Sequence, residues 1–382
     1  MSDFKAAMRD RVLVFDGAMG TYLQGFGLKP GDFDGHEGLN EILSISRPDI
    51  IKKVHLDYLE AGADVVETNT FGANAAVLAE YGLEGRVTEF NLAAARLARE
   101  AADKFSAAKP RFVAGSIGPT NKALFVTGGM SFDDMRALYL DQMLALIEGG
   151  VDLLMVETAH DAVNLRAALA AARLAFAKSG RELPVIASAT MDGKSKMLSG
   201  HDSDSFYAAA GHFPLAAIGF NCSSGPEGMR PRLERLAARA HFPTLVMPNA
   251  GLPDENGVYS QTPEKFSALM GGFASAGLLN LAGGCCGTGP AHIKALAAAV
   301  KGVRPRAPKA EEPWVISGTE ALFFDEIEPP AMAGERNNSI GSKKFRDMVA
   351  AGDRAGGGLG AGQGQRDELA DVKDLFPALA RA

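Results

Sequence analysis

The ten residues GGVDLLMVET at 149–158 decide the fold of this chain, because they repeat the form of AGADVVET at 61–68. Each stretch reads as the glycine-marked end of a helix, a turn aspartate, and a short apolar strand that ends in Glu-Thr. A strand that is apolar on both faces is typical of a sheet covered on both sides. The pair therefore predicts a parallel sheet built from strand–helix units.

Six more apolar runs continue this pattern. The predicted strands are 12–15, 65–67, 112–114, 153–156, 185–189, 217–220, 244–247 and 279–282. The predicted helices between them are 48–61, 88–105, 132–148, 161–178, 204–212, 228–240, 263–276 and 290–300. Strands that alternate with helices form βαβ units. Eight such units predict an α/β fold, a (β/α)8 barrel of the TIM type over residues 1–302.

The composition changes after residue 302. The segment VRPRAPKAEEPW at 303–314 is rich in proline and charge, which is typical of a linker, and we interpret 303–350 as a linker with some local structure. Six glycines in AGGGLGAGQG at 355–364 predict a flexible tail over 351–382, ending in one short amphipathic helix. No second domain core is expected.

The net charge and the hydropathy of the chain argue against nucleic-acid binding and against insertion into a membrane. The 382 residues carry a net charge of −7 without a long basic run, so no nucleic-acid partner is expected. No apolar run approaches the roughly 18 residues that span a bilayer. The opening MSDFKAAMRDRVLVF lacks an apolar signal core. We therefore expect a cytoplasmic protein that does not act at a membrane.

Polar side chains lie at the carboxyl ends of the predicted strands. Asp16 and Gly17 follow the first strand, Glu157 ends the fourth and Asn249 follows the seventh. Further polar or small residues at strand ends are Glu67, Thr68, Asn69, Thr70, Gly115, Ser116, Gly118, Thr190, Asp192 and Asn221. Barrel enzymes build their active sites at this end. The pattern indicates an enzyme more than a structural protein.

The three cysteines are Cys222, at the end of the sixth strand, and Cys285 and Cys286, after the eighth. An odd number with two adjacent members argues against a disulfide framework. They could be buried small apolar residues, as many cytosolic cysteines are. Alternatively, the surrounding glycines let both adjacent thiols face one ion, and thiolates favour zinc. Three protein ligands leave the fourth position open, as in catalytic Zn²⁺ sites.

The motifs at these strand ends resemble the homocysteine S-methyltransferase family over roughly residues 10–302. They are DGAMGTYLQ, VETNTFGAN, GSIGPTNK, VETAHDAVN, GFNCSSGPEGM, MPNAGLP and GGCCGTGPAHI. The likeness is greatest to the homocysteine module of cobalamin-dependent methionine synthases. GERNNSIGSKKF at 334–345 resembles the opening of the folate-binding module of those enzymes, so part of 303–350 is interpreted as its vestige.

The resemblance implies a (β/α)8 barrel with a zinc site formed by Cys222, Cys285 and Cys286. It implies that Glu157 and the Asp16–Gly17 turn bind the amino-acid end of homocysteine, with Glu157 and Asp16 as catalytic-site carboxylates. Asn249 matches the residue that fills the open zinc position before substrate binds. From the residues alone, purely structural roles are also open for three of these side chains. Asp16 and Asn249 could be turn residues, and Glu67 a rim carboxylate bonded to backbone.

We therefore expect zinc-dependent methyl transfer to homocysteine sulfur, which forms methionine. The expected donor is methylcobalamin on another chain, because the sequence lacks the Asp-x-His-x-x-Gly cobalamin motif. The expected partners are homocysteine and a separate folate- and cobalamin-binding polypeptide. One alternative is a stand-alone methyltransferase that uses betaine, S-methylmethionine or another sulfonium, with Tyr22, Phe33 and Phe71 as a possible aromatic cage. The other is a non-catalytic zinc-bearing barrel subunit.

Overall fold

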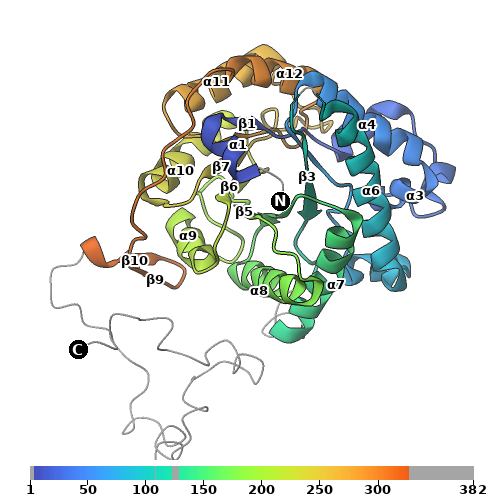
Figure 1. Cartoon of the computed structure of the whole chain (residues 1–382), viewed down its shortest axis with the longest axis horizontal. Coiled ribbons are helices and arrows are strands. Elements are labelled where there is room, and N and C mark those ends of the chain that lie inside the picture. Colours follow the sequence, from blue (N-terminus) through green and yellow to red (C-terminus); the bar gives the residue numbers. More distant parts are fainter. Residues whose placement is uncertain (1–3, 108, 123–128, 327–382) are drawn as a thin grey trace, which may run out of the picture.

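The computed structural model describes residues 4–107, 109–122 and 129–326. The sequence predictions for 327–350 and for the tail 351–382 lie outside these residues. The predicted barrel is confirmed by eight parallel strands in one sheet, in the order β1-β8-β7-β6-β5-β4-β3-β2 (Figure 1). They are β1 (Leu13–Val14), β2 (Val65–Glu67), β3 (Phe112–Ile117), β4 (Leu153–Ala159), β5 (Val185–Ala189), β6 (Ala217–Asn221), β7 (Thr244–Met247) and β8 (Leu281–Ala282).

The first and second strands close the sheet into a barrel. Phe15 forms a parallel bridge with Val65, and the backbone N–H of Asp16 donates to the Val65 carbonyl at 3.0 Å. At the other edge of the first strand, Leu13 and Val14 pair with the eighth strand. Asp16 therefore lies where the barrel closes.

All eight predicted helices are present and surround the strands (Figure 1). They are α4 (Pro48–Ala61), α6 (Val87–Phe105), α7 (Phe132–Gly149), α8 (Ala162–Ser179), α9 (Ser203–Gly211), α10 (Pro226–Arg239), α11 (Pro263–Ser275) and α12 (Pro290–Ala299). Capping residues determine where these helices begin and end, as α7 illustrates. Ser131 and Asp134 form a capping box at the start of α7, and Gly150 ends it at φ 92°.

Side chains alternate between two apolar layers along each strand. In β4, Leu153 and Met155 belong to the cluster inside the barrel, while Leu154 and Val156 belong to the cluster between strands and helices. Glu157 has the same phase as Leu153 and Met155. The alternation therefore directs its carboxylate inward at the carboxyl end of the barrel.

The amino end of the barrel is covered by α1 (Phe4–Asp10), which the sequence did not predict (Figure 1). Phe4 is fully buried in the interior cluster, and its ring meets that of Phe112 edge-on at 5.3 Å between centroids. Seven residues are too few for clear helical periodicity. The helix depends on this packing more than on its own propensity.

Short elements occupy the long segments between the first strand and α4, between the second strand and α6, and after Ala299. They are α2 (Gly20–Leu23), α3 (Leu43–Ser46), α5 (Ala75–Leu78), the 3₁₀ turns at 24–26, 30–33, 40–42, 79–81, 84–86 and 324–326, and the hairpin β9 (Val315–Ser317) and β10 (Ala321–Phe323). The first two segments follow strand ends, so their turns stand beside the barrel mouth.

Residues 303–326, which the sequence suggested as linker, lie against the barrel. The Arg306 guanidinium is buried, and it donates to the carbonyls of Ala237 and Ala240 at 2.6 Å each and of Phe242 at 2.9 Å. Its own carbonyl accepts from the Asn280 side chain at 2.8 Å. This arginine satisfies backbone acceptors near the end of α10 that would otherwise be buried without partners.

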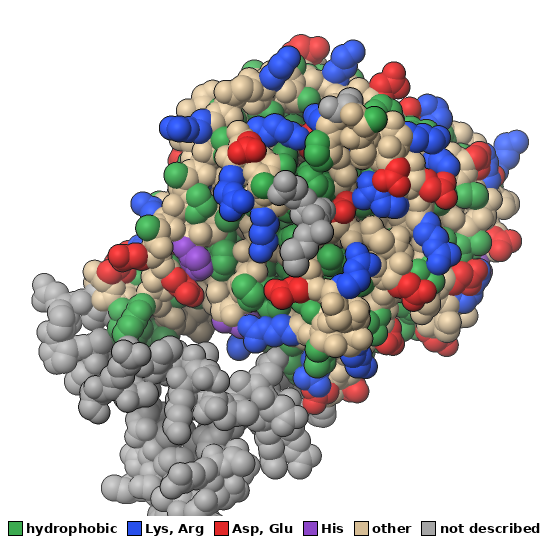
Figure 2. Space-filling view, in the orientation of Figure 1, with side chains coloured by type: hydrophobic (Ala, Val, Ile, Leu, Met, Phe, Trp, Pro, Cys, Tyr) green, Lys and Arg blue, Asp and Glu red, His purple; other side chains and the backbone are tan. Residues whose placement is uncertain are grey.

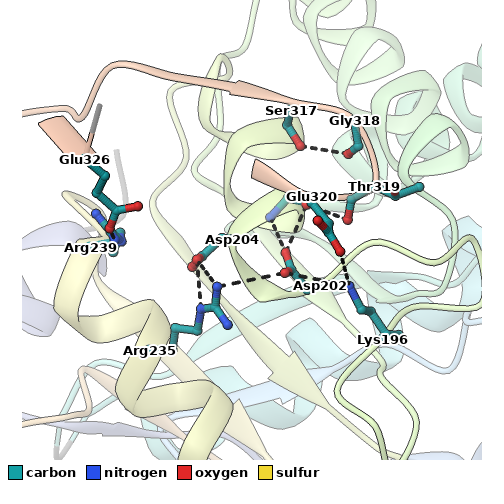
Figure 3. A network of polar contacts seen from close by, with 11 residues as sticks. Lys196, Asp202, Asp204, Arg235, Arg239, Ser317, Gly318, Thr319, Glu320 and Glu326 are labelled. Carbon is teal, nitrogen blue, oxygen red and sulfur yellow. Dashed lines mark hydrogen bonds and ion pairs between the residues drawn. The ribbon is translucent and has the colours of Figure 1, made fainter. Parts of the chain in front are cut away.

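The β9–β10 hairpin is held by a polar network around α9 and α10 (Figure 3). The Ser205 hydroxyl donates to the Thr319 carbonyl at 2.8 Å, and Arg239 pairs with Glu326. The Arg239 guanidinium also stacks on the Phe323 ring at 3.9 Å, and Phe323 is buried. Exposed ion pairs contribute little by themselves, so Phe323 is the main anchor of the hairpin.

The surface carries mixed charge. On the face shown in Figure 2, Lys and Arg side chains lie interspersed with Asp and Glu side chains. Among the described helices, none combines the length and apolarity needed to cross a membrane.

We predict that Arg306→Leu lowers the free energy of unfolding by about 2–4 kcal/mol, because three buried carbonyls lose their charged donor. Urea denaturation followed by circular dichroism measures the change. Arg304→Leu, two residues away at an exposed position, is the matched control and should change the free energy by less than about 0.5 kcal/mol. Equal stability of Arg306→Leu and wild type would contradict the anchoring role.

Candidate active site at the carboxyl end of the barrel

A cavity of about 780 Å³ opens among the segments that follow the strands. Its lining includes the carboxyl groups of Asp16, Glu67 and Glu157 and the thiols of Cys222, Cys285 and Cys286. Among the residues that the structure describes, no Lys, Arg or His lines it. The cavity is therefore strongly acidic, and a ligand with an ammonium group suits its charge.

The three cysteine thiols come together at this cavity. All three sulfur atoms lie within 4.8 Å of one another, with 3.9 Å between Cys222 and Cys286 and 4.0 Å between Cys285 and Cys286. Ligands at about 2.3 Å from a tetrahedral zinc ion stand about 3.8 Å apart. The separations of 3.9 Å and 4.0 Å fit that geometry.

Backbone conformation sets the positions of the thiols. Cys222 adopts φ 62° directly after β6, in the left-handed region that few non-glycine residues occupy. Its N–H donates to the Met247 carbonyl at 3.0 Å, and the Cys285 N–H donates to the Pro248 carbonyl at 2.8 Å. A Cβ on Gly284 would overlap the Thr288 side chain, so the turn into Cys285 requires glycine.

The three thiols are within hydrogen-bonding distance of one another, and these contacts shift their pKa values. Hydrogen bonds from Cys222 and Cys285 lower the pKa of Cys286, while hydrogen bonds with the other two thiols and burial raise the pKa of Cys285. The pKa values of the two adjacent thiols are thus shifted in opposite directions, with that of Cys286 lowered and that of Cys285 raised. A thiolate is the form that binds a metal ion.

Glu157 occupies a buried polar setting. Its Oε1 accepts from the Ser116 hydroxyl, and its Oε2 lies 3.5 Å from Asn221 Nδ2. Burial raises the pKa of Glu157 to about 7, the Ser116 hydrogen bond opposes the rise, and the charge of Cys222 adds to it. Glu157 thus exchanges its proton near neutral pH.

Asp16 and Glu67 complete a group of three carboxyls. The Glu67 N–H donates to Asp16 Oδ2 at 3.0 Å, while Asp16 Oδ1 and Glu67 Oε1 lack a hydrogen-bond partner among the described residues. Burial raises the pKa of both, and the charge of Glu157 adds to each rise. The sequence left Glu67 as a plain rim carboxylate; the structure brings it into the same cavity.

Gly17 lines the cavity beside Asp16 and has little space around it. A Cβ there would lie 2.8 Å from Thr288 Oγ1 and 3.0 Å from the Thr288 carbonyl. Asn249 is buried near the thiols but is not among the cavity-lining residues. Its N–H donates to the Ser224 carbonyl at 3.0 Å, and its Oδ1 lacks a partner among the described residues.

The suggested aromatic cage is only partly assembled. Phe33 and Phe71 line the cavity. Tyr22 instead donates to Asp57 at 2.9 Å and stacks against Tyr58, outside the cavity lining.

Several residues of the site had no assigned role in the sequence analysis. Glu41 lines the cavity and accepts from the Gly72 N–H at 2.6 Å, and its carboxylate within the apolar run LNEIL was the available signal. Asn221 accepts from the Thr158 N–H at 2.8 Å and donates to its hydroxyl at 2.6 Å. These bonds hold Thr158 at φ 55°, next to Glu157.

The fold and site together define a class of barrel enzymes in which three thiols and several carboxyls line one cavity at the carboxyl ends of the strands. The chain belongs to the homocysteine S-methyltransferase family, whose sequence pattern matches residues 13–300. The family resemblance found in the sequence is thereby confirmed.

Two relatives illustrate the range of this family. Methionine synthase of Mycobacterium tuberculosis is 39% identical over 357 residues, which cover 92% of this chain. The chain spans about 30% of the length of that relative. The oxidized form of the homocysteine methyltransferase MmuM from Escherichia coli superposes with a TM-score of 0.62 at 27% identity, covering 75% of this chain and 95% of MmuM. Its metallated form gives a TM-score of 0.61, also at 27% identity, over 76% of this chain and 96% of MmuM.

We predict that Ser116→Ala raises the pKa of Glu157 by about one to two pH units, because a hydrogen bond that favours the carboxylate is lost. Carbon-13 NMR of labelled glutamate carboxyls measures the titration. Ser188→Ala is the matched control, since the Ser188 hydroxyl donates to Asn221 at 2.7 Å and not to the carboxylate. An unchanged Glu157 titration in Ser116→Ala would contradict this assignment.

Proposed function

We propose that this chain catalyses zinc-dependent transfer of a methyl group to the sulfur of homocysteine, forming methionine. The observation that supports it most is the meeting of three thiols with the carboxyls of Asp16, Glu67 and Glu157 at one cavity. The barrel over residues 1–302 would be the homocysteine module. We also propose a cytoplasmic location, because free thiols of a metal centre persist in a reducing compartment.

Cys222, Cys285 and Cys286 would hold the zinc ion. When bound, zinc keeps the substrate sulfur deprotonated at neutral pH and leaves it nucleophilic. The three thiolates give the centre an excess negative charge, which keeps electron density on the sulfur. The Cys222 and Gly284 turns fix the thiols in place, so little reorganisation is needed when the ion arrives.

Glu157 and the Asp16–Gly17 turn would bind the amino-acid end of homocysteine. The ionised Glu157 carboxylate pairs with the ammonium group, and Asp16 Oδ1 offers a second acceptor that lacks a partner among the described residues. Backbone N–H groups of the Gly17 turn would take the substrate carboxylate. Asn249, buried beside the cysteine loops, would occupy the open metal position before substrate enters.

We propose methylcobalamin, carried by a separate folate- and cobalamin-binding polypeptide, as the methyl donor. The 39% identity to a methionine synthase over 92% of this chain supports that branch. A betaine donor would call for a cage of aromatic rings, and only two of the three suggested rings line the cavity.

A stand-alone methyltransferase with a sulfonium donor is the second candidate. The chain covers 95% of MmuM, so a barrel of this size can be a whole enzyme. A non-catalytic zinc-bearing subunit is the third candidate, and the acidic cavity beside the thiols argues against it.

We predict about one zinc ion per chain, lost for the most part in Cys222→Ala, Cys285→Ala and Cys286→Ala, because two thiolates rarely hold zinc at a catalytic site. Metal analysis gives the zinc content and circular dichroism the fold, which should persist. Ser223→Ala, in the same loop, is the matched control and should keep its zinc. Full zinc content in any cysteine variant would remove that cysteine from the centre.

We predict that Glu157→Gln weakens homocysteine binding about ten- to a hundredfold without loss of zinc, because a charge-assisted hydrogen bond is lost. In the wild type, affinity should fall about tenfold per pH unit below pH 7, as Glu157 becomes protonated, and Glu157→Gln should flatten this dependence. Asn249→Ala should keep zinc and bind homocysteine equally or more tightly. Calorimetric titration across pH decides among these outcomes, and unchanged affinity in Glu157→Gln would point to another ammonium partner.

We predict slow methionine formation from free methylcobalamin and a large increase when methyltetrahydrofolate is supplied with a polypeptide bearing folate and cobalamin modules. A carrier module raises the effective donor concentration at the barrel mouth. Methionine is quantified with each donor in turn, including betaine and S-methylmethionine. Rapid turnover of either of these by the chain alone would move the assignment to the stand-alone enzyme.

A further inference from the structure

Two threonine hydroxyls close a hydrogen-bonded ring on the backbone of Ser116. The Ser116 N–H donates to Thr68 Oγ1 at 3.0 Å, and the Thr70 hydroxyl donates to the Ser116 carbonyl at 2.7 Å. The two threonine oxygens lie 2.6 Å apart. All three residues are buried, with exposed fractions of 3% or less. The threonines therefore bind one serine at both of its backbone groups.

The direction of each bond in this ring follows from the protons that are present. A carbonyl oxygen only accepts, so the single hydroxyl proton of Thr70 is used on Ser116. Thr68 must then donate the bond between the two hydroxyls, while its oxygen accepts from the Ser116 N–H. The ring thus runs in one direction, from the Ser116 N–H through both hydroxyls to the Ser116 carbonyl. Hydrogen bonds aligned in this way strengthen one another.

The ring stands where the backbone pairing between β2 and β3 stops. The last paired residues are Glu67 and Ala114, and the Thr68 N–H donates to the Ala114 carbonyl at 2.9 Å. Ser116 has the same phase as Ala114, so its N–H and carbonyl also face the β2 side of the sheet. After Thr68 the chain turns, since the Thr70 N–H donates to the Thr68 carbonyl at 2.9 Å. The two hydroxyls thus take the place of the missing strand partner.

Ser116 connects this ring to the carboxylate that is proposed to bind the substrate ammonium. Its hydroxyl donates to Glu157 Oε1, on the neighbouring strand β4. From the helix layer, the Gln142 side chain of α7 donates to the Thr70 carbonyl at 2.7 Å and holds the turn in place. Thr68, Thr70 and Gln142 lie outside the cavity lining, which includes Ser116 and Glu157. The threonines therefore act on the site through Ser116.

We propose that Thr68 and Thr70 are positioning residues for the active site, which hold Ser116 so that its hydroxyl keeps the Glu157 carboxylate oriented toward the substrate ammonium. This inference rests on the proposed function and adds two residues that do not line the substrate cavity. A group that binds substrate needs such outer support, because small displacements weaken its contacts. Here two hydroxyls supply the support at the point where strand pairing has ended.

The proposal separates the hydroxyl groups from the packing of the threonine side chains. Thr68→Val and Thr70→Val keep the shape of each side chain but remove a hydroxyl, so each leaves one Ser116 backbone group without its partner. Thr70→Ser keeps the hydroxyl and loses only a methyl group. We expect both valine variants to bind homocysteine about three- to tenfold more weakly, which is the effect of one weakened hydrogen bond, and Thr70→Ser to bind it like wild type.

The test measures homocysteine binding by calorimetric titration and exchange of the Ser116 amide proton by NMR, for the full chain with its zinc content determined. In Thr68→Val the Ser116 amide should exchange at least about fivefold faster than in wild type, because its acceptor is gone. Thr244→Val is the matched control, since the buried Thr244 hydroxyl donates to the Leu278 carbonyl at the amino end of β7. It should lower stability but leave homocysteine binding unchanged.

Weaker homocysteine binding in both valine variants, with recovery in Thr70→Ser and no change in Thr244→Val, supports the proposal. Equal affinity in the valine variants and wild type overturns it. An equal loss in Thr70→Ser assigns the effect to packing, and an equal loss in Thr244→Val assigns it to stability, so either result also overturns it. If wild type itself does not bind homocysteine, the proposed function fails and the role toward substrate fails with it, whereas amide exchange separately reports whether the threonines hold Ser116.

Discussion

Closure of the sheet between β1 and β2 is the constraint on which the site depends. Asp16 takes part twice, since its N–H bonds to Val65 across the closing edge and its side chain accepts from the Glu67 N–H. At its other edge the first strand pairs with the eighth, and the Gly284 N–H donates to the Asp16 carbonyl at 3.1 Å, so the Cys285–Cys286 turn stands beside Asp16. Carboxyls and thiols that are far apart in sequence meet because the barrel has no open edge.

The carboxyls that suit the cavity to a cationic ligand also repel one another when they are ionised. Asp16, Glu67 and Glu157 lie together at a cavity that, within the described part of the chain, no Lys, Arg or His lines, and the pKa of each is raised. Protonation relieves their mutual repulsion in the empty protein. A cationic ligand relieves it in another way, so ligand binding and proton release are coupled at this site.

Much of this architecture could be predicted from sequence because its signals are local. Each strand is an apolar run bounded by turn residues, and the cysteines follow strand ends that a barrel brings together. Other features depend on distant contacts. Glu41 bonds to a residue 31 positions away, and Arg306 finds its acceptors more than 60 positions back in the chain. The ring through Thr68 and Thr70 likewise depends on the fold, because Ser116 lies more than 40 positions further along the chain.

The helix α1, which covers the amino end of the barrel, limits the direction from which ligands can reach the site. Phe4 packs into the amino end of the barrel, and apolar side chains fill the interior. The cavity lies at the opposite, carboxyl end. Under the proposed function, homocysteine and the methyl donor would both approach the thiols from the carboxyl end of the barrel, because the amino end is filled by Phe4 and the interior cluster.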